Sequence, residues 1–144
     1  MFKAMHDPVW VFDVEWVPDP MAGRILHQLP QETPDAEVVQ AMWEAGGADE
    51  KNPMPFLKTT LCRVVSIAAV SRTKTPQGAS LRLTSLPHDV TDSTQTNEAA
   101  MLSRFLNAVG DKKPQLVGFN SQRADLKILV QRALANGVQA AKFA

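Results

Sequence analysis

The sequence predicts a mixed α/β domain in which helices cover a sheet, and three observations lead to this class. Helix-like and strand-like segments alternate along residues 97–137, as expected when helices pack on the faces of a sheet. Two earlier strand-like segments, separated by a turn, predict an antiparallel hairpin, so the sheet should be mixed. The length of 144 residues, 44% of them hydrophobic, is sufficient for one compact core. We therefore expect a single domain over residues 1–144, with residues 18–60 as a proline-rich insertion or flap.

The first strand is expected in "VWVFDVEWVPD", residues 9–19, which is rich in β-branched and aromatic residues. Because side chains alternate between the two faces of a strand, one face should carry Trp10, Phe12, Val14 and Trp16, and the other Val11, Asp13, Glu15 and Val17. Two neighbouring carboxylates on one face repel each other, more strongly when they are partly buried. An arginine, a bound proton or a divalent cation would offset the repulsion. The alternative is an exposed strand face on which both acids are solvated.

Residues 18–60 contain six prolines that interrupt long elements. One short helix is expected there, with Thr33 as N-cap, Pro34 at its first position and Gly46-Gly47 as its stop. A segment of this length between strands is often functional, so it could form a flap over a site. It could equally be a decoration that covers an edge of the sheet.

The remaining elements follow from their periodicity. Residues 62–73 and 80–86 read as the hairpin, with Pro76 and Gly78 in its turn. Residues 97–110 read as an amphipathic helix that Thr96 or Asn97 can cap and Gly110 ends. A short strand at 115–120 precedes a second amphipathic helix at 124–137. The expected apolar stripe of this second helix is Leu126, Leu129, Val130, Ala133 and Leu134.

A third carboxylate follows the short strand. In "LVGFNSQRAD", the strand ends near Phe119-Asn120 and Asp125 opens the next helix. Sites in open α/β sheets gather at strand ends, which favours a functional role for Asp125. An acid in the first helical turn also complements the helix dipole, so Asp125 alone would be unremarkable. Together with Asp13 and Glu15 it suggests an acidic site.

The totals exclude several classes of protein. No apolar run approaches a membrane span, and residues 1–10 lack a secretory signal pattern. The single cysteine, Cys62, is consistent with a reducing cytoplasm, and the three histidines are not spaced as zinc ligands. Residues 1–60 have a charge balance of −6 and residues 61–144 of +6. This asymmetry fits either ordinary solvated surfaces or a basic half that binds phosphates.

Two segments carry a family resemblance. "VFDVEWVPD", with Asp13-Val14-Glu15, resembles the first motif of the DEDD (DnaQ-like) 3′–5′ exonucleases. "GFNSQRADLKIL", with Asn120 and Asp125, resembles the second motif, and its spacing is similar to that in family-B DNA polymerase proofreading domains and the predicted exonucleases related to them. Ala124 stands where those relatives usually carry an aromatic residue. The resemblance covers nearly all of the chain and implies an RNase H-like sheet.

The resemblance also implies a reaction and a set of roles. The reaction is hydrolysis of phosphodiester bonds at the 3′ end of single-stranded DNA or RNA, with two Mg²⁺ or Mn²⁺ ions. Asp13 would bridge the two ions, Glu15 would bind the ion that activates water, and Asp125 would support the second ion. Residues beside these carboxylates would hold the terminal nucleotide; the candidates are Val14, Trp16, Val17, Phe119, Asn120, Ser121 and Arg123. Trp16 and Phe119 also fit a place in the core.

The family pattern further requires a third motif, with a fourth aspartate and a tyrosine or histidine, downstream of the second. The sequence contains no tyrosine, and all three histidines precede Asn120. We therefore expect the front part of a longer exonuclease, truncated at its C-terminus and weakly active or inactive. The alternative is a non-catalytic module that binds nucleic acid or protein. An incomplete sheet would leave apolar helix faces uncovered, which predicts self-association.

Overall fold

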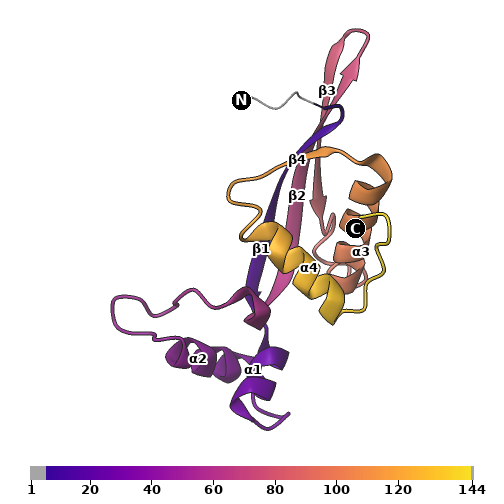
Figure 1. Ribbon diagram of the computed structural model, residues 1–144. Helices are drawn as coiled ribbons and strands as arrows, with labels where there is room; N and C mark the ends of the chain where they lie inside the picture. Colours follow the sequence, from indigo (N-terminus) through magenta and orange to yellow (C-terminus); the bar gives the residue numbers. More distant parts are fainter. Residues whose placement is uncertain (1–5, 144) are drawn as a thin grey trace. The chain divides into compact units, whose positions relative to one another are not determined.

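The computed structural model describes residues 6–143 (Figure 1). Its elements are β1 (Val9–Pro18), α1 (Pro20–His27), α2 (Asp35–Ala45), a 3-10 turn (Thr59–Leu61), β2 (Cys62–Thr75), β3 (Gly78–Leu86), α3 (Glu98–Lys112), β4 (Gln115–Val117) and α4 (Asp125–Ala135). The chain divides into two compact units. One comprises the residues up to Glu15 together with those from Val64 onward, and the other is Trp16–Arg63.

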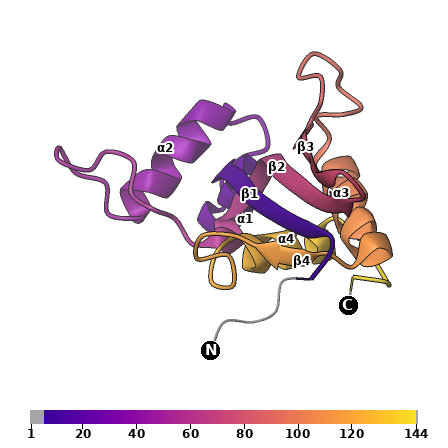
Figure 2. The same cartoon turned by 90° about the horizontal axis from the view of Figure 1, so that it is seen from above.

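The sheet has the strand order β3-β2-β1-β4. β1 and β4 are parallel, with Val9 opposite Gln115 and Val11 opposite Val117. β2 and β3 form the predicted antiparallel hairpin, from Ile67 opposite Leu86 to the turn. Figures 1 and 2 show α3 and α4 on one side of this sheet. The mixed α/β class and the order of these elements are confirmed.

The core of this unit lies between the sheet and the two helices. Alternation along β1 is as predicted, because Phe12 and Val14 are buried while Asp13 and Glu15 are exposed. The ring of Phe12 lies 5.7 Å from that of Phe105 on α3, measured between centroids. Burial of such apolar side chains is the main favourable contribution to folding. The most deeply buried members of the core on the two helices are Leu102, Leu106, Ile128 and Leu129.

The predicted end of α3 at Gly110 is wrong. The helix continues to Lys112 and ends at Lys113, whose backbone is left-handed with φ of 45° and whose N–H donates to the Val109 carbonyl. Gly110 instead allows a close approach, since a Cβ there would lie 2.7 Å from the carbonyl carbon of Lys142. At the other end Asn97 is the cap, and its side chain accepts from the N–H of Ala100.

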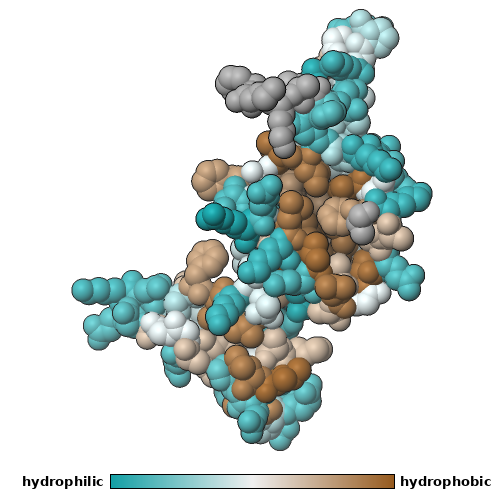
Figure 3. Space-filling view, viewed as in Figure 1, coloured by the Kyte–Doolittle hydropathy of each residue, from teal (hydrophilic) through white to brown (hydrophobic). Residues whose placement is uncertain are grey.

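The predicted apolar stripe of α4 is only partly correct. Leu129 and Ala133 are buried, whereas Val130 is 43% exposed and Leu134 is 77% exposed. The helix packs through the face that carries Asp125, Ile128 and Leu129, so the Val130–Leu134 side points outward. Apolar surface is visible over α4 in Figure 3. The predicted strand at 115–120 is also shorter, because the chain turns at Asn120, which has a φ of 53°.

The unit Trp16–Arg63 contains two helices where one was predicted. α2 is the expected helix, although Pro34 rather than Thr33 occupies its N-cap position. α1 was missed because Pro18 and Pro20 suggest a break. Pro20 in fact occupies the first turn, where proline is tolerated, and Asp19 caps the helix by accepting from the N–H of Met21 at 3.0 Å. Whether this unit acts as a flap stays a prediction.

None of the helices in the described part of the chain is both long and apolar enough to cross a membrane.

Candidate functional site

Asp13 and Glu15 lie on the outward face of β1. They point away from the core because their neighbours Phe12 and Val14 fill it. Both carboxylates are exposed, as in the solvated alternative. Within residues 6–143, neither forms an ion pair with a lysine or arginine. The negative charge on this face of β1 is therefore not neutralised by a neighbouring side chain.

Asp125 reaches β1 through the turn between β4 and α4. The parallel register, with Val11 opposite Val117, brings Gly118 next to Phe12. A Cβ at Gly118 would lie 3.3 Å from the Phe12 carbonyl oxygen and 2.7 Å from the Ser121 Cβ, so a side chain there would force the strand and the turn apart. Asp125 then opens α4 and is buried, with 4% of its surface exposed.

Asp13 lies close enough to Asp125 for its charge to act on the Asp125 carboxyl. Burial raises the pKa of the Asp125 carboxyl, and the negative charge of Asp13 raises it further. Hydrogen bonds from the backbone of Asp125 and of Val14 oppose the shift but do not cancel it. The structure therefore brings together one carboxylate from each of the two predicted motifs.

Glu15 follows Asp13 by two residues on the same exposed face of β1. Among residues 6–143, no group of three or more His, Cys, Asp or Glu side chains is arranged to hold a metal ion. The chemistry of the pair nevertheless fits a hard cation, because two carboxylates without a cationic partner offer the oxygen ligands that Mg²⁺ prefers. Glu15 is two residues from Asp13 on the same strand face and could approach a shared ion by side-chain rotation.

The turn after β4 presents most of the predicted nucleotide-binding residues. Phe119 is 96% exposed, so the interpretation of this residue as part of the core is wrong. Asn120 and Arg123 are also exposed, and Ser121 is half-buried with its hydroxyl 3.5 Å from the Gly118 carbonyl. A hollow of about 470 Å³ lies in this turn and is lined by Asn120, Ser121 and Arg123, together with Gln122 and Leu126. Sequence reasoning passed over these last two, although both lie within the second motif.

The other candidates lie on β1. The Val14 side chain is buried, so only its backbone is available, and that backbone binds Asp125. Trp16 is half-buried and Val17 is 37% exposed. Both residues belong to the unit Trp16–Arg63.

The fold and this site define a mixed α/β protein with an acidic pair where β1 meets the turn after β4. Residues 54–144 match the model of a family described as predicted 3′–5′ exonucleases related to the exonuclease domain of PolB, and the chain belongs to that family. The match contains Asn120 and Asp125, whereas Asp13 and Glu15 lie before it. Curated proteins gave no match. Solved structures gave none either.

Proposed function

We propose that this protein is a metal-dependent 3′–5′ exonuclease of RNase H-like fold that hydrolyses phosphodiester bonds at single-stranded ends. Membership in a family of predicted exonucleases supports the reaction class. The observation that carries the proposal is the juxtaposition of Asp125 and Asp13, two carboxylates from separate motifs with no cationic partner in the described residues.

Asp13, Asp125 and Glu15 are the residues that would hold the Mg²⁺ or Mn²⁺ ions. When bound, the ions supply Lewis-acid stabilisation of the attacking and leaving oxygens. Burial of Asp125 matters here, because a buried carboxylate is fixed in place and gains more from a cation than a solvated one. The Val14 backbone orients that carboxylate by hydrogen bonding.

The turn after β4 is suited to hold the last nucleotide. Phe119 presents an exposed ring on which a base can stack, and such stacking is tolerant of sequence. Asn120 and Ser121 offer hydrogen-bonding groups, and Arg123 offers a cation for a phosphate. These residues make a single-stranded DNA or RNA 3′ end the proposed substrate.

Calorimetric titration with Mn²⁺ tests the site. We expect a binding heat for the wild-type chain and its loss in Asp13→Ala and in Asp125→Asn. Asp49→Ala is the matched control, since Asp49 is an exposed acid of the unit Trp16–Arg63 and should leave the heat unchanged. Equal heats for all four proteins would remove the proposed metal site.

Hydrolysis is tested with a single-stranded oligonucleotide labelled at its 5′ end. Residues 1–144 supply three of the four carboxylates that the exonuclease resemblance implies, so we expect slow trimming from the 3′ end with Mn²⁺ and none with Asp13→Ala. Trimming that is brisk, or that survives in Asp13→Ala, would contradict these roles.

A second candidate function is a non-catalytic nucleic-acid- or protein-binding module. It is favoured by one observation, the absence of three converging metal ligands among residues 6–143. Oligonucleotide binding without any Mn²⁺ heat or any trimming would support this module over the exonuclease.

A further inference from the structure

A second groove lies between α3 and the helix-facing side of the β2–β3 hairpin. It consists of two adjoining hollows, one of about 110 Å³ and one of about 700 Å³. Trp10, Ser71, Thr84 and Ala108 line both, so the two hollows form one continuous feature. The register explains the lining, because Ala69 opposite Thr84 and Ser71 opposite Arg82 are successive same-face pairs of the hairpin.

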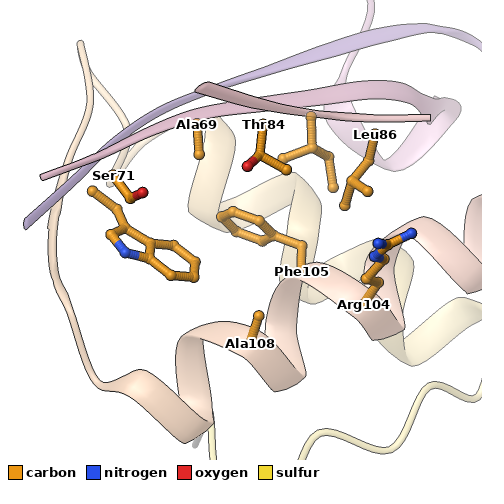
Figure 4. Close-up of a pocket in the computed structure, with 9 residues that line it drawn as sticks. Ala69, Ser71, Thr84, Leu86, Arg104, Phe105 and Ala108 are labelled. Atoms are coloured by element: carbon orange, nitrogen blue, oxygen red, sulfur yellow. The ribbon is translucent and has the colours of Figure 1, made fainter. Parts of the chain in front are cut away.

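The smaller hollow is the apolar end of this groove. Figure 4 shows Ala69, Thr84 and Leu86 on the strand side, with Phe105 and Ala108 on the helix side. Two alanines facing each other leave space that larger side chains would fill. Trp10 and Phe105 supply aromatic surface there, with ring centroids 6.4 Å apart and planes tilted by 50°. The space is therefore shaped for a flat, apolar group of modest size.

Three positively charged side chains lie along the walls of the groove. Arg82 lies on the β3 wall, and Arg104 and Lys112 lie on the α3 wall, roughly two helical turns apart. In the described part of the chain, none of the three is paired with a carboxylate. The acid in the lining, Asp111, is bound to Lys142 at 2.6 Å, which compensates its charge.

We propose that this groove binds single-stranded nucleic acid, with one base in the apolar end and the phosphates along Arg82, Arg104 and Lys112. The proposal deepens the proposed function and rests on it for the class of ligand. The chemistry that would recognise the nucleic acid is aromatic surface beside cations without carboxylate partners, which is the usual basis of sequence-tolerant binding. The groove lies on the helix-bearing face of the sheet, whereas Asp13 points from the opposite face. A nucleic-acid strand bound in this groove would not contact the carboxylates of the candidate site.

The test uses circular single-stranded DNA, which has no 3′ end and cannot occupy an end-specific site. Its binding is measured by fluorescence anisotropy with EDTA present. We expect Arg82→Gln/Arg104→Gln to weaken binding about tenfold and to reduce the salt dependence, because phosphate contacts release counterions. Lys74→Gln/Lys113→Gln removes the same charge outside the groove and should change affinity less than twofold. Equal loss in the two double variants would overturn the proposal.

Two further measurements separate this groove from the carboxylate site. Asp13→Ala should bind the circle as tightly as the wild-type chain; a loss of affinity would place the strand at the carboxylates and overturn the groove. Ala108→Leu fills the groove without altering charge and should also weaken binding, with circular dichroism confirming that it folds. Polyglutamate that competes as well as a linear oligonucleotide would show an acidic-peptide site instead. If the wild-type chain trims linear oligonucleotides but does not bind circular DNA, the proposed exonuclease function is retained and the proposed binding groove is refuted.

Discussion

Arg132 of α4 holds Glu98 of α3 through two hydrogen bonds, 2.8 Å from Nε to Oε1 and 2.6 Å from Nη2 to Oε2. Glu98 also accepts from the backbone N–H of Val64 at 2.7 Å and from the Asn136 side chain at 3.0 Å. One carboxylate therefore joins the first residue of α3, the end of α4 and the start of β2. Because α4 carries Asp125, this cluster helps to set the position of the candidate site.

Removing the Glu98 charge should destabilise the fold. Both side chains of the pair are largely buried, at 12% and 14% exposed, and breaking one partner of a buried ion pair is costly. We expect Glu98→Gln to lower the free energy of unfolding by about 3 kcal/mol in urea titration. Asp111→Asn is the control, since its pair with Lys142 is exposed and its loss should be undetectable. Similar effects in both variants would contradict the role of the cluster.

The same cluster predicts how stability depends on acid. Burial alone would raise the pKa of Glu98, but hydrogen bonds from Arg132, Val64 and Asn136, with the Arg132 charge, lower it below 4.5. A lowered pKa in the folded state adds stability above the unfolded value, and this stability disappears as the pH falls through the folded value. The difference in the free energy of unfolding between the wild-type chain and Glu98→Gln should therefore be constant above pH 4.5 and decrease below it. A difference that persists unchanged at low pH would contradict this linkage.

Asp125 should have the opposite effect. Its pKa is raised above 3.8 by burial and by Asp13, so the ionised carboxylate opposes folding as the pH rises through that range. In EDTA at pH 7, Asp125→Asn should raise the free energy of unfolding by about 1 kcal/mol, the lower end of the penalty for a poorly compensated buried polar group. The gain should vanish below pH 3.8. Glu50→Gln, at an exposed acid, should leave the free energy of unfolding unchanged, and a destabilised Asp125→Asn would refute the prediction.

The contact between α1 and α2 depends on a glycine. A Cβ at Gly23 would lie 2.5 Å from the Met42 sulfur and 2.6 Å from Val38 Cγ1. Gly23→Ala should therefore lower the stability of residues 16–63 by about 2 kcal/mol through overpacking. Faster proteolysis of this segment in the variant would reveal the loss. If the clash is the cause, Met42→Ala should reduce the effect of Gly23→Ala. An unchanged effect in that background would point to another cause.

The exposed stripe of α4 gives the self-association prediction a location. Val130 and Leu134 are four residues apart and therefore adjacent on the helix surface. Light scattering of the purified chain should show concentration-dependent association, and Val130→Glu/Leu134→Glu should abolish it without changing the circular dichroism. Lys127→Glu, on the same helix, is the control. A monomer at all concentrations would refute the prediction.

Local patterns in the sequence determine much of this protein. The alternation in "VWVFDVEWVPD" predicts which β1 side chains are buried, since the two-residue period of a strand needs no tertiary information. The hairpin, α3 and the order of the elements follow from equally local signals. The Asn120–Asp125 spacing predicts the family, which the match over residues 54–144 confirms.

Other features depend on contacts that no local pattern contains. Phe119 is exposed and Val130 lies outside the core because α4 is oriented by Glu98 and by the Asp125 contact with β1, both distant in sequence. Gly110 lies inside α3, where the absence of a side chain allows the Lys142 segment to approach the helix. The sequence by itself determined most of the elements and the family, and it predicts the carboxylates of the candidate site. Only the tertiary structure decided that Asp125 is buried and within reach of the Asp13 charge, because that outcome depends on how β1 and α4, which are distant in the sequence, pack together.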